Sequence, residues 1–191
     1  MKTTRMARRI FFLGFFTIFC GIPPNAQAGS DRFEVSAGFS FNRTLYSPGN
    51  FSWTRRWGGS FGIKFSPMSS IEFAIQDVFD RTRIIGYEHT QFHDQIYSVN
   101  WIQNLFTFES IQPYFKIGGG QLNREASGQY ANGASPNPRT DSLTAVLGAG
   151  TRVYITRSFG LRIEAMSYLT GGSIATYRDN VGFTVGGSLG F

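Results

Sequence analysis

The chain ends in Asn180–Phe191, NVGFTVGGSLGF, a stretch in which apolar residues alternate with small or weakly polar ones. A period of two is typical of a β-strand whose two faces meet different surroundings. A phenylalanine at the final position is unusual for a strand that ends in water, where chain termini usually fray. The stretch therefore predicts the closing strand of a barrel whose outer face lies in lipid. Its outward apolar residues are Val181, Phe183, Val185, Leu189 and Phe191.

Residues 1–28 are predicted to be a secretory signal peptide that is removed. Lys2, Arg5, Arg8 and Arg9 precede the apolar run Ile10–Phe19, which is too short to span a bilayer. A small-x-small cleavage pattern follows at Ala26–Ala28. A single membrane anchor is the alternative, and the short run with its cleavage pattern disfavours it. Residues 29–191 are then expected to form one domain.

Charge and cysteine content exclude several classes of function. The chain has 18 Lys and Arg against 12 Asp and Glu, a formal charge of +6. Without the four basic residues of the leader, 14 cations face 12 anions, and a balance of +2 does not suggest a nucleic-acid partner. The single cysteine, Cys20, lies in the predicted leader, so neither a disulfide framework nor thiol chemistry is expected in the mature chain.

The same alternation recurs in seven further segments, joined by three short turns and, with the closing strand, four longer polar loops. This asymmetry between turns and loops is typical of outer-membrane barrels. The sequence therefore predicts an all-β fold, an eight-stranded antiparallel up-and-down transmembrane β-barrel. The fourth segment loses its alternation near Gln103–Asn104, which either a bulge there or a different register would explain. The segments are Phe33–Phe41, Trp57–Phe65, Ile71–Gln76, Ile96–Phe108, Ile111–Leu122, Ser142–Ile155 and Phe159–Leu169, and the expected loops are Asn42–Trp57, Asp77–Gln95, Asn123–Thr140 and Thr170–Asp179.

Charged residues fall on the face opposite the apolar one in six segments. A soluble lipocalin-like barrel would have the reverse arrangement, because no small core buries unpaired charges. Inside eight strands, opposite charges are expected to pair and fill the lumen, whereas the alternative, a selective pore, needs a wider barrel. This predicted lumen charge network comprises Glu34, Lys64, Glu72, Lys116, Arg152, Arg162 and Glu164.

Aromatic residues near the ends of the segments are expected to form girdles at the two membrane interfaces. The alternative is ordinary strand propensity. The residues are Phe65, Tyr97, Phe108, Phe115, Tyr154, Phe159 and Tyr168.

Short motifs along the mature chain resemble the small outer-membrane β-barrel family, which includes the transmembrane domain of OmpA and OmpX. The resemblance implies an eight-stranded barrel with loops outside the cell and termini in the periplasm. It also implies that the aromatic C-terminal strand is recognised by the outer-membrane assembly machinery. The motifs are Pro113–Tyr114, Gly118–Gly120, Leu147–Gly150, Arg152–Tyr154, Leu161–Ala165 and Gly186–Phe191.

Two histidines, His89 and His93, leave an enzymatic alternative open. With Glu88, Asp94 and Ser98 nearby they could form a hydrolase set acting on membrane lipid. Some barrels of this size modify lipid A, but the His-x-Ser-Asn pattern of the lipid A deacylases is replaced here by His89-Thr90-Gln91. A shared metal would require a helical turn and a third ligand. We therefore expect no catalysis, no metal and no cofactor.

Arginines concentrated in or beside the long loops suggest contact with lipopolysaccharide, since guanidinium groups match phosphates. Solvated surface charge is the alternative. The expected protein is a monomer in the outer membrane of a Gram-negative-type bacterium, in contact with lipid and lipopolysaccharide. Its expected role is structural or surface-interactive, in envelope integrity or adhesion. The arginines are Arg43, Arg55, Arg56, Arg81, Arg83, Arg124, Arg139 and Arg178.

Overall fold

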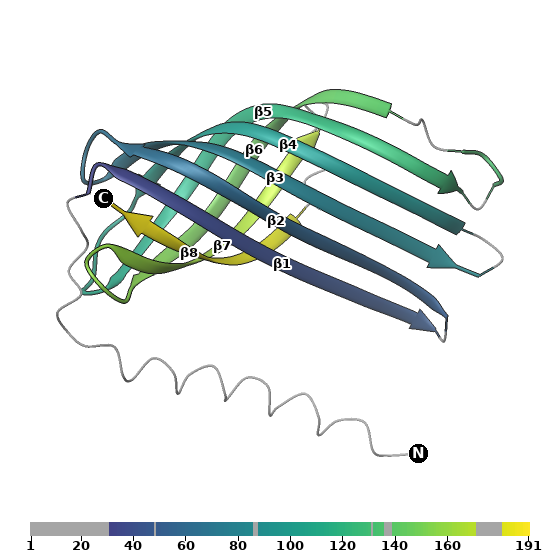
Figure 1. Ribbon diagram of the computed structural model, residues 1–191, viewed down its shortest axis with the longest axis horizontal. Coiled ribbons are helices and arrows are strands. Elements are labelled where there is room, and N and C mark those ends of the chain that lie inside the picture. The colour runs from purple at the N-terminus through teal and green to yellow at the C-terminus, as the bar shows by residue number, and fades with distance from the viewer. Residues whose placement is uncertain (1–30, 48, 86–87, 131, 136–138, 171–180) are drawn as a thin grey trace, which may run out of the picture.

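Eight antiparallel strands form one closed barrel in the computed structural model, each paired with its neighbours in sequence and the last with the first (Figure 1). This confirms the predicted fold class. The structure describes residues 31–47, 49–85, 88–130, 132–135, 139–170 and 181–191, so the predicted signal peptide lies outside the described residues. The strands are β1 (Phe33–Ser47), β2 (Asn50–Lys64), β3 (Ser69–Ile84), β4 (Glu88–Asn104), β5 (Ile111–Gln129), β6 (Arg139–Tyr154), β7 (Phe159–Thr170) and β8 (Val181–Gly190).

The closing seam lies between β1 and β8, as the C-terminal pattern predicts. Their register runs from Glu34 opposite Gly190 to Phe39 opposite Val185. The final residue completes the ladder, because the backbone groups of Phe33 and Phe191 exchange two hydrogen bonds of 3.0 Å. Their rings lie 5.9 Å apart. The C-terminus is therefore tied into the sheet.

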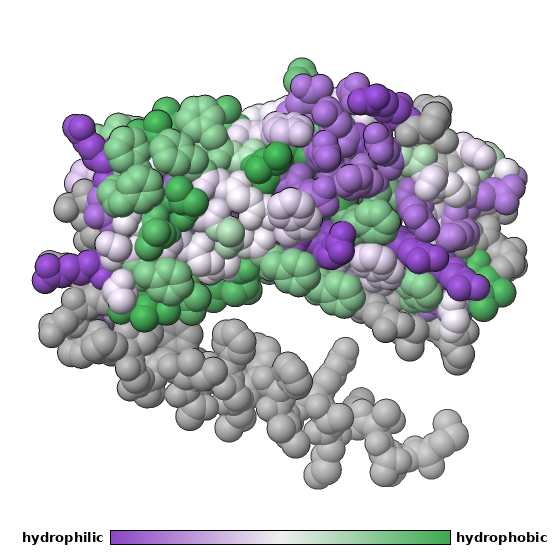
Figure 2. All heavy atoms as spheres, in the orientation of Figure 1, coloured by the Kyte–Doolittle hydropathy of each residue, from purple (hydrophilic) through white to green (hydrophobic). Residues whose placement is uncertain are grey.

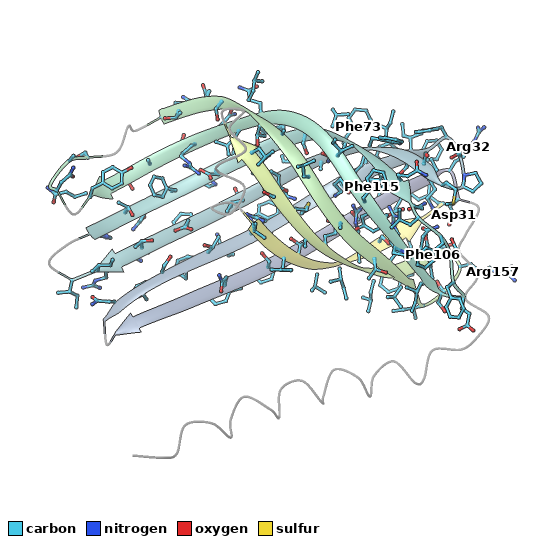
Figure 3. The ribbon with its side chains drawn as sticks, turned by 180° about the vertical axis from the view of Figure 1, so that it is seen from behind. Asp31, Arg32, Phe73, Phe106, Phe115 and Arg157 are labelled. Atoms are coloured by element: carbon cyan, nitrogen blue, oxygen red, sulfur yellow. The ribbon has the colours of Figure 1, made fainter. Side chains whose placement is uncertain are left out.

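Every strand places large apolar side chains on the outside of the barrel, which we call the apolar belt. On the face drawn in Figure 2, hydrophobic residues gather over the half nearest the short turns, and hydrophilic residues gather over the other half. Seen from behind, Phe73 and Phe115 lie on the outside, while Asp31, Arg32 and Arg157 lie at the end with the short turns (Figure 3). One exposed member from each strand in order is Phe39, Trp57, Phe73, Val99, Ile117, Leu147, Leu161 and Val185.

The strands extend further than the alternation predicts. The predicted loop Asp77–Gln95 is mostly paired strand, because the β3–β4 register continues from Ser69–Gln103 to Ile84–Glu88. Most of Asn42–Trp57 and parts of Asn123–Thr140 are also strand. A ladder of backbone hydrogen bonds requires no apolar side chains, so strands continue past the belt where both faces are polar. We call this extended end the open end, and the opposite end, which holds Phe191, the turn end.

The fourth strand needs no bulge. Pairing with β5 continues without a shift to Asn104 opposite Tyr114, where β4 ends, so Phe106 and Phe108 belong to the connection. Gln103 does lie on the outward side, where the Ser69 hydroxyl donates a 2.5 Å hydrogen bond to Gln103 Oε1. The expected bulge was wrong because a polar residue at the end of the belt has a polar partner.

Two of the seven expected girdle residues point into the lumen instead. Tyr154 and Tyr168 are buried, and their hydroxyls donate to Gln112 (3.1 Å) and Gln76 (2.5 Å). Each lies an even number of positions from Arg152 or Glu164 on its own strand, so alternation itself places it inside. The remaining five, Phe65, Tyr97, Phe108, Phe115 and Phe159, are on the outer surface.

Candidate functional site

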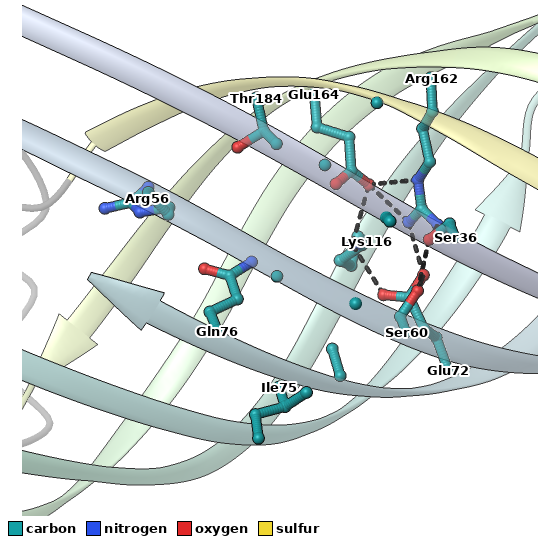
Figure 4. A pocket seen from close by; sticks show the side chains of 16 residues that line it. Ser36, Arg56, Ser60, Glu72, Ile75, Gln76, Lys116, Arg162, Glu164 and Thr184 are labelled. Atoms are coloured by element: carbon teal, nitrogen blue, oxygen red, sulfur yellow. Dashed lines mark hydrogen bonds and ion pairs between the residues drawn. The ribbon is translucent and has the colours of Figure 1, made fainter. Parts of the chain in front are cut away.

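Arg162 lies at the centre of a buried group of charges inside the barrel (Figure 4). Its Nη2 lies 2.6 Å from Glu72 Oε2 and 2.6 Å from Glu164 Oε1. Lys116 Nζ approaches the same two carboxylates, at 2.8 Å from Oε1 of each. The Tyr114 hydroxyl donates a further hydrogen bond of 2.6 Å to Glu164. Two cations and two anions from three strands therefore satisfy one another.

A second group lies next to it, towards the turn end. Arg152 donates from Nε to Glu34 Oε1 at 2.9 Å and from Nη1 to Asn104 Oδ1 at 2.9 Å. Lys64 Nζ lies 3.8 Å from Glu34 Oε2, and Arg162 Nη1 lies 3.7 Å from Glu34 Oε1, which joins the two groups. All seven residues of the predicted lumen charge network are thus brought together, and we call them the ion-pair cluster.

The ion-pair cluster leaves little free space. The cavity beside it, lined by Glu72, Lys116, Arg162 and Glu164, measures about 40 Å³, room for roughly three water molecules. Breaking a buried pair costs about 3–5 kcal/mol because the remaining charge stays buried without a partner. The arrangement therefore closes the lumen and cross-links the wall, as a plug would.

An apolar layer follows on the side of the open end. It is the hydrophobic core of the barrel interior. Tyr168 belongs to this layer, and its hydroxyl donates a hydrogen bond to Gln76. Along their strands the residues of this layer lie between the ion-pair cluster and the open end. Its members are Val78, Ile96, Leu122, Val146, Met166 and Tyr168.

Beyond the apolar layer the lumen widens into a cavity of about 860 Å³, which we call the vestibule. Arg124 binds Asp94 there in a bidentate manner, from Nε at 2.7 Å and Nη2 at 2.6 Å. The Thr54 hydroxyl donates a 2.7 Å hydrogen bond to Asp80. Burial raises the pKa of the Asp80 carboxyl, although the hydrogen bond from Thr54 opposes the shift. The vestibule lies on the open-end side of the apolar layer and is far larger than the cavity beside the ion-pair cluster.

The outer surface just past the belt carries a row of aromatic rings across β1 to β4, which we call the aromatic row. It consists of Phe41, Trp53, Phe79 and His93, with successive ring centroids 6.2, 5.4 and 6.1 Å apart. The Arg55 guanidinium lies over the Phe79 ring at 5.9 Å. Such a band of rings and cations suits the boundary between hydrocarbon and lipid head groups.

The expected loop arginines are divided between the two faces. Arg56 and Arg124 point into the vestibule, whereas Arg55, Arg81, Arg83 and Arg139 occupy outward positions of their strands. The side chain of Arg43 and all of Arg178 lie outside the described residues. Alternation extended backwards from the outward Trp57 places Arg56 inside, so this signal was present in the sequence.

The hydrolase set drawn from the sequence is split by the barrel wall. Asp94 and Ser98 face the lumen, whereas His93 lies outside in the aromatic row. His93 Nε2 lies 2.7 Å from Asp77 Oδ2 instead, and His93 shares a surface groove of about 400 Å³ with Ser127 and Glu125. His89 is exposed on the same strand. Among the described residues no group of three or more His, Cys, Asp or Glu side chains could hold a metal ion.

The C-terminal residues expected to guide assembly lie on the outside of β8. Val181, Phe183, Val185, Leu189 and Phe191 are all exposed there. Gly182, Gly186 and Gly190 alternate with them and face inward, where there is no room for a side chain. A Cβ at Gly186 would overlap the carbonyl oxygen of Ala37, and one at Gly182 would overlap the Arg56 guanidinium. In the part of the chain described here, no helix has the length and hydropathy to cross a membrane.

No protein-family profile matches the chain, and no curated protein sequence matches it significantly. Among solved structures, Ail, the attachment invasion locus protein of Yersinia pestis, superposes with a TM-score of 0.51 at 12% identity, covering 86% of this chain and all 100% of Ail. Neisserial surface protein A gives 0.49 at 14% identity, covering 83% and 96%. The N-terminal barrel domain of Pseudomonas aeruginosa OprF gives 0.47 at 17%, covering 86% and 100%. The likeness to Ail shows the fold, that of the small outer-membrane β-barrels.

Proposed function

We propose that this chain is an integral outer-membrane protein without catalytic activity, whose role is to anchor lipopolysaccharide around a rigid barrel. The observation that carries the proposal is the aromatic row with Arg55 and Arg81 beside it, directly past the apolar belt. A belt flanked by rings and cations fixes the depth of a barrel in a membrane. Envelope integrity would follow from this anchoring, and the same exposed end would serve adhesion.

Guanidinium groups at this height meet the phosphates of the lipid head groups. Arg55 is exposed and rests on Phe79, while Arg81 has a buried Nε without a hydrogen-bond acceptor among the described residues. A phosphate oxygen would supply that acceptor, and charge-assisted hydrogen bonds are the stronger kind. The patch therefore offers two cations for one or two phosphates.

The remaining features of the proposal concern orientation and assembly. Outer-membrane barrels have short periplasmic turns, which supports an orientation with the turn end in the periplasm and the open end outside. Pairing between β1 and β8 closes the sheet from Glu34 to Phe39, which leaves little free edge for a second copy and favours a monomer. The outward residues of β8 would be recognised by the assembly machinery. Deleting Phe191 should then reduce the yield of folded barrel in the outer membrane, and an unchanged yield would contradict this.

Co-purification of lipopolysaccharide tests the role. The double variant Arg55→Gln/Arg81→Gln and the control Arg157→Gln, which lies at the turn end, would be extracted from outer membranes in a mild detergent. We expect the double variant to retain about tenfold less lipopolysaccharide per barrel, since hydrogen bonds to charged groups contribute about 1.5–3 kcal/mol. Equal retention by the double variant and the wild type would refute the proposal.

A second function is favoured by one specific observation, the groove that holds His93 and Ser127. Asp77 orients the ring through Nε2, which leaves Nδ1 as the base. Ser127 Oγ would attack an acyl ester of a membrane lipid and pass its proton to His93, which returns it to the leaving alkoxide. Water would then hydrolyse the acyl-enzyme to a free fatty acid. Mass spectrometry of lipid A incubated with the barrel tests this, because acyl loss abolished in Ser127→Ala would replace the non-catalytic proposal.

A further inference from the structure

Arg56 is the exception among the buried charges of the barrel interior. It is only 7% exposed, yet its Nε and Nη1 have no hydrogen-bond acceptor among the described residues. In Figure 4 it points away from the ion-pair cluster, beyond Gln76, and no interaction line reaches it. Its guanidinium lies over the Tyr168 ring at 5.2 Å. A buried donor without an acceptor costs stability, so an unpaired cation here requires an explanation.

The carboxylates that line the vestibule with Arg56 are already engaged. Both oxygens of Asp94 accept hydrogen bonds from Arg124, and Asp80 accepts one from Thr54. In the ion-pair cluster, by contrast, each of the four cations lies within 4 Å of a glutamate. The positive charge of Arg56 is therefore left facing the vestibule, which it lines.

The vestibule is also open on one side of the barrel wall. Among the described residues, pairing between β1 and β8 ends at Phe39 and Val185, although both strands continue. Phe41 on β1 and Val181 and Phe183 on β8 line the vestibule beside this gap. Their exposed fractions are 58%, 47% and 71%, so an apolar surface leads from the outside of the barrel into the cavity.

Arg56 lies directly behind the gap. Its side chain starts on β2, opposite Ser40 of β1, and its guanidinium reaches Gly182 of β8. The absence of a side chain at Gly182 is what allows this contact, because an added Cβ would overlap the guanidinium. Arg56 thus lies at the inner end of the apolar surface that leads through the gap between β1 and β8.

We propose that the vestibule binds an amphiphile with an oxyanion head group. The carboxylate or phosphate is held by Arg56, and the apolar chain lies in the gap between β1 and β8 against Phe41, Val181 and Phe183. The head group supplies the acceptors that the guanidinium lacks, and the chain covers exposed apolar surface. A free fatty acid and an anionic membrane lipid share this chemistry. The head-group site is inside the wall, whereas the lipopolysaccharide patch is on the outer surface, and the two share only Phe41.

Calorimetric titration of the folded barrel with decanoate in a nonionic detergent tests the proposal. Saturable binding of one decanoate per barrel is expected, while decanol, which lacks the charge, should bind at least about tenfold more weakly. Arg56→Gln should weaken decanoate binding by about tenfold or more. The matched control Arg83→Gln removes an outward arginine from the same end and should leave binding unchanged. Heat-modifiable gel migration shows that each variant is folded.

Gly182→Ala provides an independent variant that keeps the charge but displaces the guanidinium, and it should weaken binding in the same way. Competition with dodecyl phosphate and with mixed micelles of an anionic phospholipid identifies the source. Displacement by the phospholipid points to a membrane lipid, and displacement by dodecyl phosphate alone points to a free amphiphile. Equal decanoate binding by wild type and Arg56→Gln, or equal binding of decanol and decanoate, would overturn the proposal. Arg55 and Arg81 are unchanged in these variants. Failure of the decanoate proposal can therefore be distinguished from failure of the lipopolysaccharide proposal.

Discussion

The two halves of the lumen differ in whether their buried charges are paired. At the turn end, seven charged residues share one network and the adjoining cavity is about 40 Å³. At the open end, the cavity is about 860 Å³ and holds Arg56, which lacks a hydrogen-bond acceptor at two nitrogens. A network in which charges are paired stabilises a wall and excludes solutes, whereas a wide cavity with a free cation can bind one. The difference separates a structural half from a half suited to binding.

The largest expected effect is the loss of one member of the ion-pair cluster. Glu72→Gln leaves Arg162 and Lys116 short of a buried anion, and should lower the free energy of unfolding by about 3–5 kcal/mol. Urea unfolding of the barrel in lipid vesicles measures it. The corresponding change at the open end, Asp80→Asn, should cost less than about 1 kcal/mol. Equal losses at the two ends would remove the contrast between the halves.

A charge added to the outer surface should likewise destabilise the barrel more within the apolar belt than past it. Val99→Lys places a charge in the middle of the apolar belt, which costs about 2–4 kcal/mol in a transmembrane barrel. Gln91→Lys, on the same face of the same strand but past the belt, should change stability by no more than about 0.5 kcal/mol. The same unfolding measurement applies, and a tolerated lysine at position 99 would show that this surface is not in lipid.

A smaller effect is expected for the ion pair of the vestibule. Arg124 is 32% exposed at its side chain, so Asp94→Asn should cost only about 1 kcal/mol. High salt should reduce this cost, since screening acts on exposed charges, while the cost of Glu72→Gln should hardly depend on salt. Unfolding curves at low and high ionic strength compare the two. If the destabilisation by Asp94→Asn did not change with salt, the vestibule would not be open to water.

The smallest effect concerns pH. The raised pKa of Asp80, caused by burial, means that its carboxyl binds a proton more tightly in the folded barrel than in the unfolded chain. Its contribution is therefore fully present below the unfolded pKa, about 3.9, and is lost as the pH rises through the folded pKa. The wild type should lose stability relative to Asp80→Asn as the pH rises above about 4. Parallel pH profiles of the two proteins would contradict this.

Alternation was sufficient to predict the strands inside the belt and the inward position of all seven cluster residues. It works there because lipid on one side and a packed lumen on the other impose different side chains on successive positions. It failed past the belt in Asp77–Gln95, where the outer face mixes aromatic rings with charged residues and the vestibule within is lined by both apolar and charged ones, so nothing alternates. The strands continue there because backbone hydrogen bonds do not require any particular pattern of side chains.

The vestibule could not be predicted for a related reason. Pairing of Asp94 with Arg124 depends on the register between β4 and β5, which places these residues directly opposite each other. Register is a tertiary property, and a shift of one residue would send either side chain to the other face. The free Arg56 is harder still to foresee, because it depends on where β8 separates from β1.

Thiol accessibility tests the division of the lumen most directly, and the described residues contain no cysteine to interfere. Thr54→Cys lies in the vestibule, and Asn100→Cys lies at a position 2% exposed beside Glu72. With a charged thiol reagent on the folded barrel, we expect Thr54→Cys to react readily. Asn100→Cys should react on the order of a hundredfold more slowly until urea unfolds the protein. Equal reaction rates at the two positions would contradict a lumen that is closed at the turn end and open at the other.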